Sequence, residues 1–425
     1  MAGADAGRST PGEQWDSLAV VLDLIRSGLA VTKPELARET GHGRTAISLR
    51  LAQLADIDLI ANGGLAMSSG GRAARELSFR ADRGCCLVAE LGATGFSLGI
   101  ANLRGEIVTS AREAADIAEG PEPILDRVQE VFDELLTDGT RSGTPVWGVG
   151  IGVPGPVEYR TGRPVAPPIM PGWDDYPIRE RFEARYRAPV WVDNDVNLMA
   201  LGEFRAGLAR GESDLVYVKV GSGIGAGLIS NGRLHRGAKG VAGDLGHVEV
   251  EHDSSALCRC GNYGCLEAIA GGAALVRAAI DAAAGSGGLL ADRLGERGTL
   301  VLADLLNAAG RADRVAVDLL SMSAARVGQM LATVVNLHNP SLIIMGGAVA
   351  TATDAYLAGV REVVLRRSLP LATRDLTIAT SPLRDRAGLL GAAFMVLDEL
   401  FSPAGLASWV DRGSPVLPPV PDDRV

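Results

Sequence analysis

The N-terminal part of the chain shows apolar side chains at helical spacing. Residues 15–26 place them three and four positions apart, and residues 44–55 do so again. A shorter helix is predicted over residues 33–40, with Thr32 before it as the N-cap. The glycine-rich stretch at residues 41–43 separates the second and third helices. This order of helix, short helix, tight turn and polar-faced helix predicts a helix-turn-helix unit.

Two short apolar segments follow the third helix, at residues 59–61 and 77–79. They flank the Ser-Ser-Gly-Gly-Arg stretch at residues 68–72 and are predicted to pair around it as a wing. Together these elements predict a winged helix-turn-helix domain over residues 15–80, preceded by a disordered tail at residues 1–14. A three-helix adaptor that does not bind DNA is the alternative, because a single sequence often matches this pattern by chance.

The charge of the whole chain does not favour a nucleic-acid partner. The formal net charge is −10 and the isoelectric point about 5.2, although a small DNA-reading domain can lie within an acidic chain. From residue 44 to residue 80 the basic residues outnumber the acidic ones, and phosphate neutralisation supplies much of the affinity for DNA. The basic residues in this part are Arg44, Arg50, Arg72, Arg75 and Arg80.

Four residues are candidates for direct DNA contact. Arg44, Thr45 and Ser48 lie near the start of the third helix, the part of a recognition helix that meets base edges. Arg72 lies in the predicted wing, where it would touch phosphate or the minor groove. A dimer of such domains would suit a palindromic operator with half-sites about one DNA turn apart.

From residue 81 onward, strand patterns alternate with helical ones, which predicts an α/β domain over residues 81–400. Its two lobes are expected at residues 81–200 with 385–400 and at residues 201–384. Residues 401–425 contain five prolines and are predicted to be a loose tail. The main strands are predicted at residues 85–90, 96–102, 146–153, 190–192, 215–220 and 342–345.

No segment predicts a membrane span or a secretory signal. No run approaches the roughly 18 apolar residues that cross a bilayer, and residues 1–12 lack an apolar core. The protein is therefore expected to be cytoplasmic, with no membrane partner. Cys85 and Cys86 lie in a predicted strand and are expected to be core residues.

The other three of the five cysteines fall within eight residues. Cys258, Cys260 and Cys265 follow His247 along the chain, and three thiolates with one imidazole are the ligand set of a closed zinc site. Three buried thiols in a glycine-rich loop are the alternative. Since no signal peptide is predicted, a metal is favoured over disulfides. With all four positions taken by protein, zinc would be structural rather than hydrolytic.

Residues 243–247, Gly-Asp-Leu-Gly-His, and residues 258–267, Cys-Arg-Cys-Gly-Asn-Tyr-Gly-Cys-Leu-Glu, resemble the signature of the ROK family. This family contains bacterial sugar kinases and sugar-responsive repressors. Its members carry Gly-Glu-x-Gly-His and then Cys-x-Cys-Gly-x-x-Gly-Cys-x-Glu, so the one departure is Asp244 in place of Glu. The resemblance extends over residues 15–400. It implies a two-lobed ribonuclease H-like domain of the sugar kinase, hexokinase and actin type.

The resemblance implies a sugar site. In ROK kinases an Asn-Asp pair touches the sugar and its Asp is the general base, and these residues are Asn194 and Asp195 here. The residues that bind further sugar hydroxyls in the family correspond to Asp244, His247 and Glu267. Asp244 is one methylene shorter than Glu and keeps the acceptor chemistry. From the residues alone, Asp-Asn-Asp at positions 193–195 is also typical of a helix N-cap.

The resemblance further implies three loops on the nucleotide side of the cleft. The first is Asp-x-Gly-Gly-Thr in the family, whereas this chain has Glu90 in the first position and Ala93 in the fourth. A longer carboxylate and an added methyl group both oppose the close approach of phosphate and of hydrated magnesium. Taken alone, these stretches fit ordinary hairpins and crossovers. The loop residues are Glu90, Gly92 and Thr94, then Gly221, Ser222 and Gly223, and then Gly346 and Gly347.

Three functions compete on this sequence. The first is a sugar-responsive transcription regulator that binds operator DNA and a sugar or sugar derivative, as a homodimer or homotetramer with structural zinc. The second is an ATP-dependent sugar kinase with an appended DNA-binding domain, which would require ATP and magnesium. The third is a zinc-stabilised scaffold with neither activity. Glu90, Ala93 and the N-terminal domain favour the regulator, whereas Asp195, Glu267 and the second phosphate loop favour the kinase.

Overall fold

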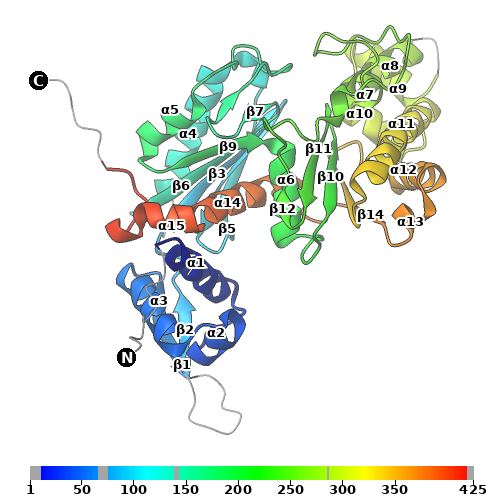
Figure 1. The fold of residues 1–425 in the computed structure, drawn as a ribbon. Coiled ribbons are helices and arrows are strands. Elements are labelled where there is room, and N and C mark those ends of the chain that lie inside the picture. The colour runs from blue at the N-terminus through cyan, green and yellow to red at the C-terminus, as the bar shows by residue number, and fades with distance from the viewer. Residues whose placement is uncertain (1–10, 66–74, 138–142, 285–286, 419–425) are drawn as a thin grey trace, which may run out of the picture.

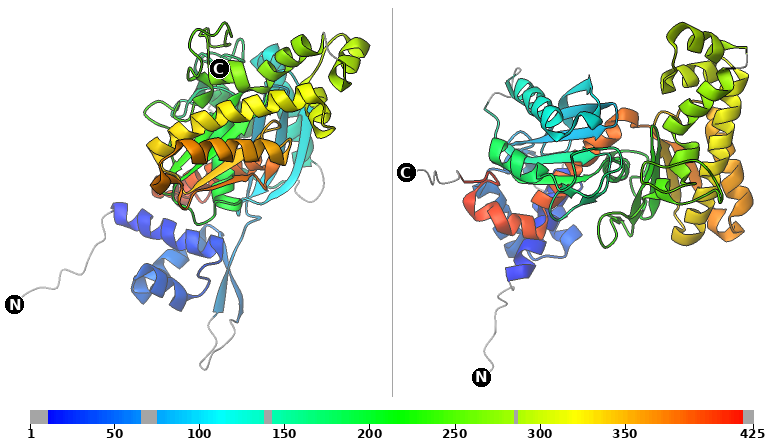
Figure 2. Two further views of the ribbon diagram at one scale, coloured as in Figure 1. Left: turned by 90° about the vertical axis from the view of Figure 1, so that its right-hand side faces the viewer. Right: turned by 90° about the horizontal axis from the view of Figure 1, so that it is seen from above.

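The computed structural model describes residues 11–65, 75–137, 143–284 and 287–418 (Figure 1). A small N-terminal head lies at the bottom of Figure 1. Above it, the body consists of two β-sheets side by side, each with its own helices. The view from above in Figure 2 shows these two halves of the body well separated at their outer ends.

Three helices and a two-stranded sheet form the head, as the sequence predicts. The first helix begins at Pro11 rather than at residue 15, so the predicted disordered tail is wrong from residue 11 onward. Proline is tolerated in the first turn of a helix, where its missing N–H has no partner to lose. The predicted wing tip with Arg72 lies outside the described residues. The elements are α1 (Pro11–Ser27), α2 (Lys33–Thr40), α3 (Arg44–Asp56), β1 (Ile60–Leu65) and β2 (Arg75–Phe79).

Local hydrogen bonds explain why α2 begins and ends where the sequence predicts. The Thr32 hydroxyl accepts from the backbone N–H of Glu35 at 3.4 Å, and the Glu35 carboxylate accepts from the N–H of Thr32 at 3.0 Å. This reciprocal capping box satisfies two donors that a helix start leaves unpaired. Gly41 ends the helix with φ of 70°, a left-handed conformation that favours glycine. The predicted N-cap is therefore confirmed.

The two sheets of the body share one topology. In each, three antiparallel strands in a meander are followed by two parallel strands on the other side of the first strand. The turn between β3 and β4 is therefore equivalent to the turn between β10 and β11. The first sheet runs β5 (Ile107–Ala114), β4 (Gly95–Asn102), β3 (Cys85–Gly92), β6 (Val146–Val153) and β9 (Val190–Asn194). The second runs β12 (Arg233–Leu234), β11 (Ile224–Ser230), β10 (Leu215–Val220), β13 (Leu342–Gly346) and β14 (Thr377–Thr380).

Helices cover both faces of the first sheet, and other helices cover both faces of the second. α4 (Pro121–Thr137) and α5 (Ile178–Tyr186) pack on one face of the first sheet, and α14 (Ala387–Leu400) packs on the other. α6 (Asp195–Ala206) packs between α14 and the second sheet. The lobe boundary predicted at residue 200 therefore falls inside a continuous helix. The outer face of the second sheet carries α8 (Gly272–Ala283), α11 (Arg314–His338) and α12 (Asp354–Arg367).

The predicted loose tail is wrong over residues 403–412. This segment forms α15 (Pro403–Trp409) and a short 3-10 helix (Val410–Arg412). Ser402 caps α15 by accepting from the N–H of Gly405 at 2.9 Å, and Pro403 suits the first turn. The buried indole of Trp409 donates to the carbonyl of Leu400 at 3.0 Å. The number of prolines was a poor guide, because Pro403 lies in the first turn of a helix, where proline is tolerated.

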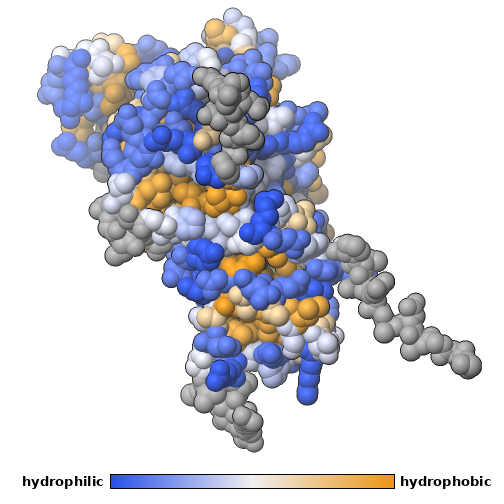
Figure 3. All heavy atoms as spheres, turned by 90° about the vertical axis from the view of Figure 1, so that its left-hand side faces the viewer, coloured by the Kyte–Doolittle hydropathy of each residue, from blue (hydrophilic) through white to orange (hydrophobic). Residues whose placement is uncertain are grey.

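The same C-terminal segment joins the head to the body. α1 packs against α15, and one continuous apolar core contains residues of both. The guanidinium of Arg104 in the body donates to the backbone carbonyl of Arg26 at 2.7 Å, and the Arg26 side chain lies 5.9 Å from the ring centre of Phe401. Figure 3 shows apolar side chains gathered on the head and where it meets the body. The head is thus fastened to the end of α14 by packing.

No single helix among the described residues is long and apolar enough to cross a bilayer. Only a bent pair, residues 384–400 together with 403–412, reaches the necessary length and apolarity. Both members of that pair contribute many buried residues to the core described above.

Candidate functional site

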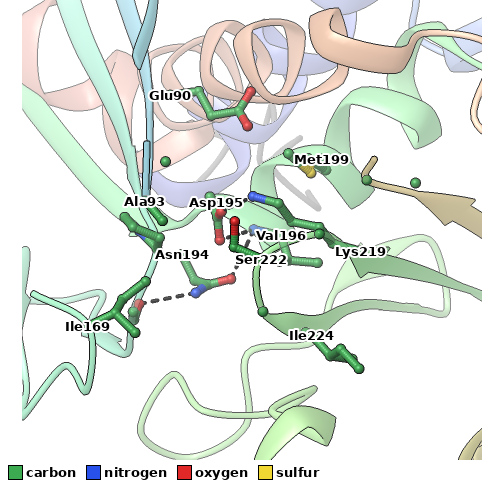
Figure 4. Close-up of a pocket in the computed structure, with 18 of the residues that line it drawn as sticks. Glu90, Ala93, Ile169, Asn194, Asp195, Val196, Met199, Lys219, Ser222 and Ile224 are labelled. Carbon is green, nitrogen blue, oxygen red and sulfur yellow. Dashed lines mark hydrogen bonds and ion pairs between the residues drawn. The ribbon is translucent and has the colours of Figure 1, made fainter. Parts of the chain in front are cut away.

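A cavity of about 1000 Å³ lies between the two halves of the body. The two equivalent turns, β3–β4 and β10–β11, both line it, and so does the end of β9 (Figure 4). The structure thereby brings together residues that are more than 250 positions apart in the sequence. All the predicted sugar and phosphate residues line this cavity: Glu90, Gly92, Thr94, Asn194, Asp195, Gly221, Ser222, Gly223, Asp244, His247, Glu267, Gly346 and Gly347.

The Asn-Asp pair both caps a helix and faces the cavity. Asn194 is the N-cap of α6, since its Oδ1 accepts from the N–H of Val196 at 2.9 Å. Its Nδ2 donates to the carbonyl of Gly155 at 3.1 Å, which ties the start of α6 to the loop after β6. The Asp195 carboxylate is buried, and its Oδ1 also accepts from Val196 N–H, at 2.8 Å. The segment can therefore be both a helix N-cap and part of the cavity wall, so the two interpretations of the sequence are compatible.

Lys219 is a cleft residue that the sequence analysis missed. Its ammonium lies 2.5 Å from Oδ2 of Asp195. Figure 4 marks this ion pair with a dashed line. The other residues of β10 are apolar or aromatic and buried. A single charge in a buried strand is rare unless it has a partner. That pattern was visible in the sequence and could have identified Lys219.

A second cation holds the other carboxylate of the Asp-Asn-Asp segment. Nε of Arg236 lies 2.7 Å from Oδ2 of Asp193, and its guanidinium lies 3.7 Å from the ring centre of Tyr159. The Tyr159 hydroxyl donates to Oε1 of Glu399 near the end of α14, at 2.8 Å. The sequence does not predict this cluster, because its four members lie far apart in the chain. They are Asp193, Arg236, Tyr159 and Glu399.

The Glu267 carboxylate contacts the second phosphate loop directly. Oε2 of Glu267 accepts from the N–H of Ile224 at 3.0 Å. A Cβ added at Gly223 would lie only 2.3 Å from the same oxygen, so glycine is required for this approach. Asp244 lies on the loop before His247, with one carboxylate oxygen 4.0 Å from His247 Nε2. These acceptors gather at the end of the cavity next to the cysteine cluster.

Glu90 lies in the cavity wall beside α14. A Cβ added at Gly388 would lie 2.0 Å from its Oε2, so the carboxylate rests on the helix backbone where only glycine leaves space. Burial raises the pKa of Glu90 to about 7, although the nearby Lys219 ammonium acts in the opposite direction. In Figure 4 its carboxyl group points away from Ala93 and the turn. Glu90 therefore loses its proton at a higher pH than an exposed carboxyl group does.

The His-Cys-Cys-Cys cluster could hold a metal ion. One ligand atom from each of His247, Cys258, Cys260 and Cys265 lies within 4.8 Å of all the others. Zinc–sulfur bonds of about 2.3 Å in a tetrahedron require sulfur–sulfur distances of about 3.8 Å. The sulfurs of Cys260 and Cys265 are 3.7 Å apart, and Cys258 Sγ is 3.4 Å from His247 Nδ1. The donor set and its spacing therefore fit one tetrahedral ion.

The predicted DNA-facing side of α3 is exposed. Arg44, Thr45 and Ser48 all project to solvent, whereas Ile47 and Leu51 pack into the head. The separation of faces is incomplete, because Leu49 is also exposed while Arg50 is buried.

Two arginines that the sequence analysis counted toward a basic surface have other partners. Arg50 is only 5% exposed, and its guanidinium donates to Gln53 at 2.9 Å and to Ser17 of α1 at 3.4 Å. Arg80 forms an ion pair with Asp58. The packing of α1 on α3 covers Arg50, which helical periodicity alone does not reveal. The basic surface of the head is therefore smaller than its arginine count suggests.

Comparisons with known proteins agree on one family. A family model described as "ROK family" matches residues 86–399. The xylose repressor of Caldicellulosiruptor bescii is 28% identical over 386 residues, which cover 90% of this chain and 96% of that protein.

Solved structures give the same result. A crystal structure of a ROK family transcriptional regulator, described as a homolog of the E. coli MLC protein, has a TM-score of 0.80 at 25% identity and covers 94% of this chain and all of that one. A ROK family glucokinase from Streptomyces griseus, in complex with glucose and AMPPNP, has a TM-score of 0.65 at 30% identity. The glucokinase covers 73% of this chain and 99% of its own.

Replacing Glu90 by Gln should flatten the pH dependence of stability. The folded pKa of about 7 exceeds the ordinary value of 4.5, so the folded state binds the extra proton between these values. The stability from this proton is fully present below about pH 4.5 and is lost as the pH rises through about 7. Between about pH 5 and pH 8, the wild type should lose more stability than Glu90→Gln in chemical denaturation followed by circular dichroism. The exposed Glu362→Gln serves as the control, and equal slopes for wild type and Glu90→Gln would contradict the prediction.

Proposed function

Because the chain belongs to the ROK family, we propose that it is a DNA-binding transcription regulator, acting as a repressor, whose kinase-like cleft senses a sugar. The observation that carries the proposal is that one chain packs a head with an exposed helix face onto a body with a two-sided polar cleft. The similarity to the xylose repressor extends over 90% of the chain, so it includes at least part of the head. The glucokinase similarity covers only 73%.

The head would act as a winged helix-turn-helix. α3 would enter the major groove, with Arg44, Thr45 and Ser48 at base edges, and Arg72 would contact phosphate or the minor groove. A homodimer or homotetramer would place two heads on the half-sites of a palindromic operator. The exposure of the α3 face supports this role, whereas Arg50 is excluded from it by burial.

The cleft would bind the sugar through its hydroxyl groups. Asn194 and Asp195 approach from one side, and Asp244, His247 and Glu267 from the other. Carboxylates and an imidazole are the acceptors and donors that polyols require. D-xylose is the first ligand to test, because the similar regulator of C. bescii is named a xylose repressor.

The cysteine cluster would hold one structural zinc ion. Nδ1 of His247 faces the sulfur of Cys258, while Nε2 lies toward Asp244. Zinc would thus fix the imidazole orientation and leave its other nitrogen for the ligand. With three thiolates and one imidazole as ligands, no position remains for a catalytic water.

Sugar kinase activity is the second candidate, because all three predicted phosphate loops line the cavity. ATP and magnesium would then be cofactors and Asp195 the general base. Glu90, Ala93 and the Lys219–Asp195 ion pair oppose it. A coupled assay for ADP release on hexoses and pentoses separates the two candidates, since turnover on the order of 1–100 per second is typical of kinases.

Purified protein should contain one zinc ion per chain by elemental analysis. Cys260→Ser should lose the metal and show a lower melting temperature, because metal binding and folding of the loop are one equilibrium. Cys86→Ala removes a thiol from the core of the first sheet and should retain zinc. Wild-type protein without zinc would contradict the assignment.

A sugar should weaken binding of the wild-type protein to a palindromic operator selected from random DNA. Asp195→Asn should bind the same operator but respond to D-xylose only at higher concentration, because the acceptor carboxylate is lost. Fluorescence anisotropy of labelled DNA measures both effects. Asp375→Asn, on an exposed stretch away from the cleft, should respond as wild type. A wild-type dose response in Asp195→Asn would show that the ligand binds elsewhere.

Arg44→Ala should weaken operator binding by about 1–3 kcal/mol and relax base preference at the position it contacts. The expected cause is the loss of a charge-assisted contact to a base edge. Binding to operators with single-base changes measures the effect on preference. Arg374→Ala removes an equally exposed arginine from the body and should leave binding unchanged. If Arg44→Ala bound the operator with wild-type affinity, the assignment of α3 as the recognition helix would be wrong.

A further inference from the structure

Lys219 has an unusual position for an ammonium group. It is one of three lysines in the chain and the only charged residue of β10. Its side chain is 24% exposed and that of Asp195 is 4% exposed, so the ion pair at 2.5 Å is largely removed from solvent. The other oxygen of Asp195 is held by the N–H of Val196 at 2.8 Å. Both carboxylate oxygens therefore have donors before any ligand enters.

Three carboxylates from separate elements act electrostatically on this ammonium, and Asp195 contacts it directly. Asp195 comes from α6, Glu90 from the end of β3, and Asp385 from the short helix before α14 (Arg384–Arg386). Asp385 also pairs with Arg112 of β5 at 2.5 Å, and Arg112 lines the same cavity. Burial lowers the pKa of Lys219, but the neighbouring carboxylates outweigh burial and raise it. Lys219 is thus a permanent cation among acidic groups.

We propose that the Lys219 ammonium occupies the region in which a phosphoryl-transfer site holds its divalent cation, so that the cleft admits a neutral sugar but excludes Mg²⁺ and its nucleotide complex. Lys219 is then a specificity-determining residue of the sensor. The statement that the cleft admits a sugar rests on the proposed function. The statement that it excludes Mg²⁺ does not, because it depends only on the residues that line the cleft.

Two physical reasons support the exclusion. A divalent cation beside a buried ammonium meets like-charge repulsion in a region of low dielectric. Mg²⁺ also requires oxygen ligands at about 2.0–2.1 Å in octahedral geometry. Here Oδ2 of Asp195 is engaged by Lys219, and the Asp385 carboxylate is engaged by Arg112. The residues therefore do not fit the magnesium ion that kinase members of the family require.

The same ion pair changes what Asp195 can do. To accept a proton at Oδ2, the carboxylate would have to break its contact with the ammonium. It can still accept a hydrogen bond from a sugar hydroxyl through remaining lone pairs. The cleft thus retains recognition of a polyol without the proton acceptor that transfer requires.

A purely structural role for Lys219 is the alternative. The ion pair joins α6 to β10 and could serve only to hold that helix in place. In that case, removing the ammonium would lower stability but would create no affinity for a cation. The two roles therefore differ in a measurement of metal binding.

The experiment is a titration of zinc-loaded protein with Mn²⁺, followed by electron paramagnetic resonance of the free ion. Wild type should bind Mn²⁺ only weakly. Lys219→Met, similar in length but neutral, should bind about one Mn²⁺ per chain at least tenfold more tightly than wild type. The double variant Lys219→Met with Glu90→Gln should lose this gain, and Lys219→Arg should exclude the ion as wild type does. Lys33→Met makes the same chemical change in the head and should behave as wild type.

Tight Mn²⁺ binding by wild type, or no gain in Lys219→Met, would overturn the proposal. If Lys219→Met is unfolded by circular dichroism, Lys219→Gln repeats the test with a polar side chain. Operator binding is measured separately, so a protein that excludes Mn²⁺ but fails to bind DNA would refute the proposed function and leave this inference standing.

Discussion

The close contact between α6 and α14 is the constraint on which the rest of the body depends. α6 lies against the second sheet and α14 against the first, so these two helices form the layer between the halves. A Cβ added at Gly202 would lie 2.1 Å from the carbonyl oxygen of Ala387, and one at Gly391 would lie 1.7 Å from that of Leu198. Only glycine at both positions allows the helix backbones to approach this closely.

Both helices carry functional groups at their N-terminal ends. α6 begins with Asp195 in the cleft, and the first turn of α14 supports Glu90 through Gly388. The other end of α14 continues into α15 and the core that holds the head. Because packed cores change by discrete shifts rather than continuous deformation, a change in the angle between α6 and α14 would reach the head through side-chain packing. The head and the body are therefore joined by one packed core.

Two buried ion pairs lie at the end of β9, beside the cleft. Asp193 and Asp195 are 2% and 4% exposed, and each is matched by one cation, Arg236 and Lys219. Removing one partner of such a pair leaves an uncompensated buried charge, which is strongly destabilising. The cations therefore hold the segment at residues 193–195 in one conformation at the cavity wall. Rigidity of this wall suits a site that recognises hydroxyl geometry.

The amino-acid sequence by itself determined the parts that depend on near neighbours in the chain. The helices of the head follow from apolar spacing and from Thr32 and Glu35, three residues apart, which form the cap. Most of the metal ligand set lies within a short segment, at residues 258–265, and could be identified without a fold. The family resemblance supplied the sugar and phosphate residues, and all of these line one cavity.

Only the tertiary structure decided which partner each buried charged group meets. Lys219 and Asp195 are 24 positions apart, Arg236 and Asp193 are 43 apart, and Arg50 and Ser17 are 33 apart. Local periodicity carries no information on such pairs, because they form only when separate sheets and helices pack. The helix after residue 402 has a local start signal in Ser402 and Pro403, but Trp409 is buried beside Trp147, a contact between residues far apart in the chain that only the packed core supplies.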